Sequence, residues 1–157
     1  MELYDWLLAL HVLSAVAWIA ALVVFSVVLV AGRRLSVPSD VARMFQVARA
    51  GDVLIAVGMI GTIVFGIWLA LDEYEIWDGW IIAALVLWVV AAAFGGQVGK
   101  VYNAARDRAK ALLDEGRDAP SPELNAILRS PRGAILHTLM VLVTLAILVV
   151  MIYKPGA

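Results

Sequence analysis

The chain has 157 residues, of which 64% are hydrophobic and 16% charged, with a mean hydropathy of +0.94 and a formal net charge of -1. Soluble domains are typically about 45–50% apolar and about 25% charged, so this composition indicates an integral membrane protein. The sequence contains no cysteine, which excludes disulfides and thiolate-bound metals. Its two histidines, His11 and His137, are too few for a histidine-rich metal cage within one chain.

The first apolar segment covers residues 4–31 and carries no charge between Asp5 and Arg33. A bilayer core roughly 30 Å thick needs about 20 residues of helix, so the segment can span it. Glu2 and Asp5 lie at the start of the chain before the uncharged run, which is longer than the apolar core of a signal peptide. We therefore expect a retained membrane span.

His11 lies inside this first span, and the helical period places Ser14 and Trp18 on its side of the helix. An ionisable group at membrane depth is costly and by default marks a functional site. We expect this face to look into a helix bundle. A histidine that only forms a hydrogen bond between helices is the alternative interpretation.

The second span is predicted over residues 52–71. Residues 41–49 before it have helical spacing and predict either an interfacial helix or a cytoplasmic lead-in to the span. Gly58, Thr62 and Gly66 recur every four residues, which is typical of a close helix contact. Val28 of the first span, by contrast, is expected to face lipid.

The third span is predicted over residues 80–98, after an acidic, aromatic-rich hairpin. Gly95 and Gly99 form a second small-residue pair that we expect to face another helix. Charges of alternating sign follow Lys100, so the helix is expected to continue into a polar region and to stop at Gly116.

The fourth span is predicted over residues 133–153, after a polar connection with one short amphipathic turn around Leu124. His137 and Met140 share a face of this span. Four consecutive spans predict an all-α, integral membrane four-helix up-down bundle that forms one transmembrane domain over residues 1–157.

Basic residues predict the orientation of the bundle. They occupy the connections between spans one and two and between spans three and four, whereas the hairpin between spans two and three has none. The positive-inside rule places the basic connections in the cytoplasm and both termini outside a bacterial inner membrane. The basic residues are Arg33, Arg34, Arg43, Arg49, Lys100, Arg106, Arg108, Lys110, Arg117, Arg129 and Arg132.

Several short motifs resemble a bacterial group of small four-helix membrane proteins. They are the stretch from His11 to Trp18 (HVLSAVAW), the stretch 66–69 (GIWL), Trp80 after an acidic loop, and the closing Lys154-Pro155-Gly156. The group includes the copper-resistance protein D domain and the membrane protoporphyrinogen oxidase of haem synthesis. The chain looks most like an uncharacterised integral membrane family related to those two.

The resemblance implies a haem or metal role for the first-span histidine, which His11 matches. The oxidase family also carries a lysine soon after its third-span tryptophan, whereas residues 81–84 here hold no lysine. The copper-resistance proteins imply copper handling, and copper(I) favours soft sulfur ligands with imidazole as an option. Haem b is therefore the first cofactor expected, with copper or no cofactor as alternatives.

Ligation of one haem iron by both histidines is a further hypothesis. His11 lies towards one membrane surface and His137 towards the other, so their offset is on the order of 20 Å at 1.5 Å rise per residue. This offset argues against a shared iron. The candidate cofactor-binding residues are His11, Ser14, Trp18, His137 and Met140, with His11 as the metal ligand.

Two classes of function remain open at this point. One is a haem- or metal-binding protein with a redox or metal-handling role, and the other is a non-catalytic membrane subunit that packs against membrane partners. The sequence does not decide whether the protein is an enzyme. We expect contact with the lipid bilayer, a homo-oligomer or a larger membrane complex, and no nucleic acid.

Overall fold

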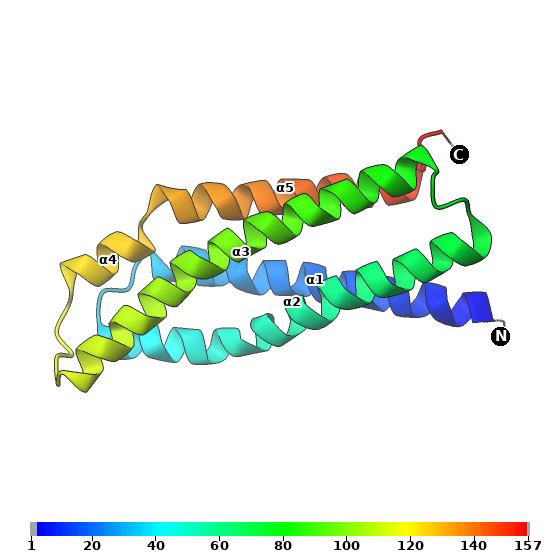
Figure 1. Ribbon diagram of the computed structural model, residues 1–157. Coiled ribbons are helices and arrows are strands. Elements are labelled where there is room, and N and C mark those ends of the chain that lie inside the picture. Colours follow the sequence, from blue (N-terminus) through cyan, green and yellow to red (C-terminus); the bar gives the residue numbers. More distant parts are fainter. Residues whose placement is uncertain (1–2, 157) are drawn as a thin grey trace.

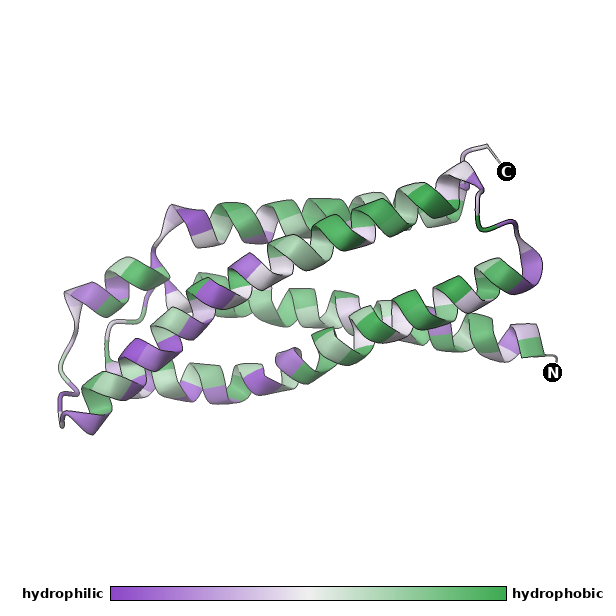
Figure 2. Ribbon diagram, viewed as in Figure 1, coloured by the Kyte–Doolittle hydropathy of each residue, from purple (hydrophilic) through white to green (hydrophobic). Residues whose placement is uncertain are grey.

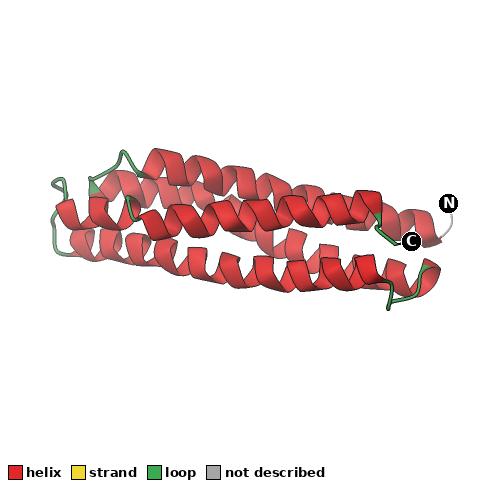
Figure 3. Ribbon diagram, turned by 90° about the horizontal axis from the view of Figure 1, so that it is seen from above, coloured by secondary structure: helices red, strands yellow, loops and turns green. Residues whose placement is uncertain are grey.

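The structure is a computed structural model that describes residues 3–156, and all of its regular elements are helices. The four long helices lie side by side, and their connections sit at the two ends of the bundle (Figures 1 and 3). This arrangement confirms the all-α four-helix bundle with sequential up-down connections. The elements are α1 (Leu3–Gly32), α2 (Pro38–Glu73), α3 (Gly79–Asp114), the short α4 (Pro122–Leu128) and α5 (Pro131–Tyr153).

The two ends of the bundle differ in chemistry. One, here called the termini end, carries both chain termini and the hairpin between α2 and α3 (Figure 1). The other, here called the basic end, carries the α1–α2 connection and α4. Hydrophilic residues concentrate in the halves of α2 and α3 near the basic end, whereas the rest of the long helices is mainly apolar (Figure 2). All four long helices contain a stretch long and apolar enough to cross a membrane.

Helices α2 and α3 extend well beyond the predicted spans. Residues 41–49 are continuous with the second span, which confirms the lead-in rather than a separate interfacial helix. Helix α3 continues past Lys100 to Asp114, and Gly116 follows with a φ of +70°, a conformation that glycine adopts at little cost. Both extensions are stabilised by tertiary packing at the basic end.

A small apolar core fills the basic end. Val41 on α2, Ala109 on α3 and Leu124 on α4 are each fully buried there. Val28 on α1 belongs to the same core and is only 7% exposed, so the expectation that it faces lipid is wrong. Residues of the extended part of α2, of α3 and of α4 form the rest of this core and bury Val28.

The helices pack as two pairs, α1 with α2 and α3 with α5, and α1 touches α5 only sparsely. Helices α1 and α2 approach closely at Gly58, because a Cβ at this position would lie only 2.7 Å from the Trp18 Cα. In the second pair, a Cβ on Gly95 would lie 3.3 Å from the Met140 sulfur, whereas one on Gly99 would meet nothing within 4 Å. The predicted contacts of Gly58 and Gly95 are therefore confirmed, and that of Gly99 is wrong.

Candidate functional site

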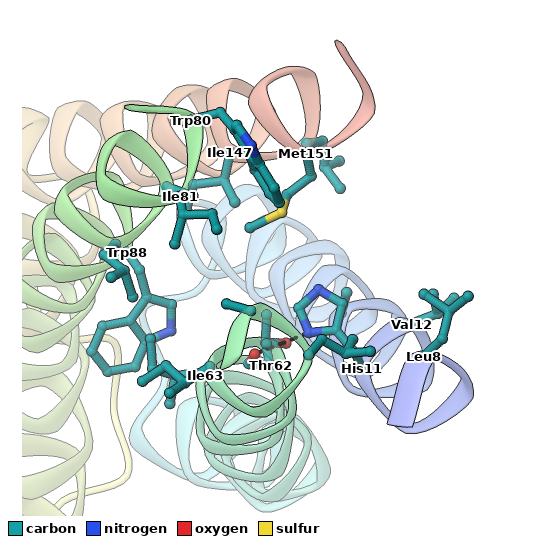
Figure 4. Close-up of a pocket in the computed structure, with 18 of the residues that line it drawn as sticks. Leu8, His11, Val12, Thr62, Ile63, Trp80, Ile81, Trp88, Ile147 and Met151 are labelled. Carbon is teal, nitrogen blue, oxygen red and sulfur yellow. Dashed lines mark hydrogen bonds between the residues drawn. The ribbon is translucent and has the colours of Figure 1, made fainter. Parts of the chain in front are cut away.

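A cavity of about 370 Å³ lies between the two helix pairs in the half of the bundle near the termini end (Figure 4). This volume falls in the range of about 300–1,000 Å³ that is typical of small-molecule sites. All four long helices contribute to its wall, which is mainly apolar. The cavity therefore suits a largely hydrophobic ligand that also makes a few polar contacts.

His11, the ionisable residue identified in the first span from sequence, lies on the α1 wall of this cavity. Its Nδ1 lies 3.0 Å from the backbone oxygen of Thr62 on α2. A carbonyl oxygen can only accept a hydrogen bond, so Nδ1 carries the proton and donates it. In the neutral imidazole, Nε2 then keeps a free lone pair. Nε2 points away from Thr62, towards the side of the cavity formed by Trp80 and Met151 (Figure 4).

The position of the His11 ring depends on a glycine in α2. A Cβ on Gly66 would lie 2.9 Å from Cε1 and 3.1 Å from Nδ1 of His11. Any larger residue at this position would displace the ring. The predicted small-residue stripe of α2 therefore has a second role besides helix packing, because it makes room for the imidazole beside the cavity.

Three further polar groups on cavity-lining residues have no hydrogen-bond partner among the described residues. They are the indole Nε1 of Trp18, the hydroxyl of Thr62 and the indole Nε1 of Trp80, and all three side chains are at least nine-tenths buried. An indole N–H can only donate, and an unsatisfied buried donor is costly. A ligand with acceptor oxygens would satisfy such donors.

A basic group lies on the cavity wall close to the termini end. Lys154 follows α5 in the left-handed conformation, with a φ of 41°. Its Nζ donates a hydrogen bond to the Tyr74 hydroxyl at 2.6 Å and lies 4.5 Å from the centre of the Tyr74 ring and 5.4 Å from that of Trp80. Residues 81–84 lack a lysine, but the fold brings one to Trp80 from the end of α5.

The cavity is not sealed between α1 and α5. Leu8, Val12 and Val16 of α1 line it, yet they are 40%, 49% and 56% exposed. Since α1 and α5 make few contacts, these side chains border a lateral opening. In a membrane-spanning bundle this opening faces the hydrocarbon layer, so a lipophilic ligand can reach the cavity from the bilayer.

The structure separates the two histidines. His137 on α5 is 4% exposed and lies with Nε2 2.8 Å from the Ser26 hydroxyl. Ser26 also donates to the Leu22 carbonyl at 2.8 Å, so Nε2 of His137 is the donor to Ser26. Ser26 is 15 residues after His11 on α1, a rise of about 22 Å. The predicted offset in depth is therefore present, and His137 forms a hydrogen bond between helices away from the cavity.

Of the other predicted site residues, one lines the cavity and two do not. Trp18 lines the cavity, whereas Ser14 and Met140 are not part of its wall. The Ser14 hydroxyl donates to the Leu10 carbonyl at 2.7 Å, and Met140 packs in the apolar core next to Trp18. The sequence analysis missed the Thr62 carbonyl and Lys154, and it did not assign Trp80 or Met151 to the site. Lys154 had a visible signal, as the single basic residue outside the two basic connections.

Carboxylates contribute little to the cavity. Within residues 3–156, no group of three or more His, Cys, Asp or Glu side chains is placed to hold a metal ion. The acidic residues of the hairpin between α2 and α3 do not line the cavity either. Its polar chemistry is therefore an imidazole, an ammonium group, indole N–H groups and hydroxyls.

The fold and the cavity define a class: a small polytopic membrane protein with a ligand-sized cavity among its spans. The chain belongs to the family of predicted integral membrane proteins DUF2269, whose family model matches residues 5–155. Comparison with curated proteins and comparison with solved structures each gave no match.

Proposed function

We propose that this protein binds haem b in the cavity, with His11 as an iron ligand, and has a redox or metal-handling role in the membrane. The observation that carries the proposal is the hydrogen bond from Nδ1 of His11 to the Thr62 carbonyl, which leaves Nε2 free on the cavity side. Histidines that bind metals almost always donate their other ring N–H to a carboxylate, a backbone carbonyl or water. The resemblance of the stretch around His11 to haem-associated families supports the same assignment.

The residues of the cavity suit haem better than a bare copper ion. A porphyrin supplies the equatorial ligands of its iron, so one imidazole is a sufficient protein ligand, as in globins. Met151 lies across the cavity from His11 and adds a thioether (Figure 4). A copper ion would depend on these two side chains for its ligands, whereas an apolar cavity of this size also offers contacts to a macrocycle.

In this proposal each part of the chain has a distinct task. Haem, when bound, would supply one-electron chemistry. His11 would hold the iron, and Thr62 and Gly66 would fix the orientation of the imidazole. The apolar wall would exclude water, and the lateral opening between α1 and α5 would admit the lipophilic ligand from the bilayer.

We expect the purified protein to show a Soret band, either as isolated or after addition of haem. His11→Ala should lose this band or weaken haem affinity at least about 10-fold, because removal of a metal ligand should cost at least as much as loss of its supporting hydrogen bond. His137→Ala is the matched control and should retain the band. A preparation that stays colourless with added haem would contradict the proposal and favour a non-catalytic membrane subunit.

We further propose that the basic end faces the cytoplasm of a bacterial cell, with the cavity in the outer half of the inner membrane. Eleven basic residues at or near the basic end support this orientation, against none in the hairpin between α2 and α3. The chain has no cysteine of its own, so introduced cysteines report cleanly.

A cysteine at exposed Glu75 should react with an impermeant thiol reagent in intact cells, and one at exposed Asp114 should react only after permeabilisation. Labelling of both sites in permeabilised cells is the control. Labelling of Asp114→Cys alone in intact cells would reverse the proposed orientation.

A further inference from the structure

We infer that Lys154 is the recognition site for a carboxylate of the cavity's ligand, so that the site selects an amphipathic acid and orients its acidic edge towards the termini end. The inference rests on the proposed function and deepens it, because it assigns a second polar contact to the same ligand. It also adds a specificity-determining residue that lies on a different helix from His11.

Lys154 carries a positive charge that no ion pair among the described residues neutralises. The acidic hairpin begins next to Tyr74, yet none of its carboxylates pairs with the Lys154 ammonium. The rings of Tyr74 and Trp80 stabilise the cation without neutralising it. An ammonium without a carboxylate partner beside an apolar cavity is suited to bind an anionic group.

Lys154 is held in place before any ligand binds. The Tyr74 hydroxyl accepts one of the three N–H donors of the ammonium, which leaves donors free for a ligand. Tyr74 in turn packs edge-on against Trp80, with ring centres 5.2 Å apart. A side chain fixed in this way loses little conformational freedom when it binds an anion.

The polar groups of the cavity lie at different depths along the bundle. His11 lies beside Gly66 of α2, and Tyr74 comes eight residues later, directly after the end of α2, so the Lys154 contact is about 12 Å closer to the termini end. The unpartnered Nε1 of Trp80 is a second donor close to Lys154. A planar macrocycle held at its centre by His11 would reach this region with an acidic side arm.

The basic residues of the chain are unevenly distributed. Lys154 is the single Lys or Arg outside the two basic connections, out of 12 in the chain. Among the described residues, no other Lys or Arg side chain lines the cavity. An acidic ligand of the cavity therefore has one cationic partner there, and loss of that residue cannot be compensated by a neighbouring one.

The test compares haem with its dimethyl ester, which keeps the iron and the macrocycle but lacks the free carboxylates. The parent protein should bind haem about 10-fold more tightly than the diester, the effect of one charge-assisted hydrogen bond. Lys154→Met keeps the length of the side chain and removes its charge. It should bind the two ligands alike, with its diester affinity unchanged, which also shows that the variant is folded. Lys154→Arg should keep the preference for haem.

The possible outcomes distinguish failure of the Lys154 contact from failure of haem binding itself. If the parent binds both ligands alike through His11, or if Lys154→Met keeps the preference of the parent, the inference fails while haem binding stands. If the parent binds neither ligand, both fail. A preference for haem that disappears in Lys154→Met and returns in Lys154→Arg would establish the contact.

Discussion

Gly58→Leu is expected to lower the stability of the detergent-solubilised protein more than any other single substitution considered for this chain. A Cβ at this position would lie 2.7 Å from Cα and 2.8 Å from Cβ of Trp18, and still closer to its backbone nitrogen. Backbone atoms cannot rotate away, so α1 and α2 would have to separate. Overpacking typically costs about 1–3 kcal/mol, and we expect about 3 kcal/mol here, or a fall in melting temperature of roughly 6–12 °C.

Gly96→Leu on α3 is the matched control for this experiment. Gly96 is exposed, and a Cβ there would meet nothing within 4 Å. Leucine favours helix over glycine by up to about 1 kcal/mol, so the control should be as stable as the parent or slightly more stable. Equal melting temperatures for Gly58→Leu and the parent, measured by thermal unfolding in detergent, would contradict the close contact of α1 with α2.

Gly66→Ala is expected to impair ligand binding far more than stability. The added methyl group would lie 2.9 Å from Cε1 of His11, and an imidazole can rotate to relieve this contact. Rotation would break the hydrogen bond from Nδ1 to the Thr62 carbonyl and turn Nε2 out of position. Loss of such a supporting contact typically costs 10- to 100-fold in metal affinity, and we expect a loss of about that size in haem titrations.

The control for Gly66→Ala is Gly96→Ala, which makes the same chemical change away from the cavity. Its haem affinity should equal that of the parent. A Gly66→Ala protein that binds haem as tightly as the parent would show that the orientation of the His11 ring by α2 is not required. The melting temperature of the same preparations would show whether the fold is preserved.

Much of this fold follows from sequence because the bilayer imposes a simple rule on span length and polarity. The four spans, the helical character of residues 41–49 and the stop at Gly116 were predictable from sequence, whereas the continuity of residues 41–49 with the second span was one of two alternatives. The surroundings of Val28 and Gly99 were not predictable, because burial of a side chain in a span depends on which neighbours cover it. Residues of the extended α2, of α3 and of α4 bury Val28, whereas the face of α3 around Gly99 stays open.

The candidate site was predictable only in part. An ionisable residue within a span identified His11, and helical spacing placed Trp18 beside it. The same spacing suggested Ser14, but the Ser14 side chain packs against Gly61 of α2 and does not line the cavity. The Thr62 carbonyl is a backbone group, so the residue type at this position does not reveal its contact with His11. Lys154 lies beyond the last span, and only the fold brings it to Tyr74 and Trp80.

Pulsed electron spin resonance of the ferric protein labelled with ¹⁵N-histidine tests most directly whether Nε2 of His11 binds haem iron. The chain has two histidines, so His137→Gln leaves His11 as the only labelled residue, and His11→Gln leaves His137. We predict a ¹⁵N coupling to the iron in the labelled parent and in His137→Gln, and none in His11→Gln. Haem bound to labelled His137→Gln without any ¹⁵N coupling would contradict the account.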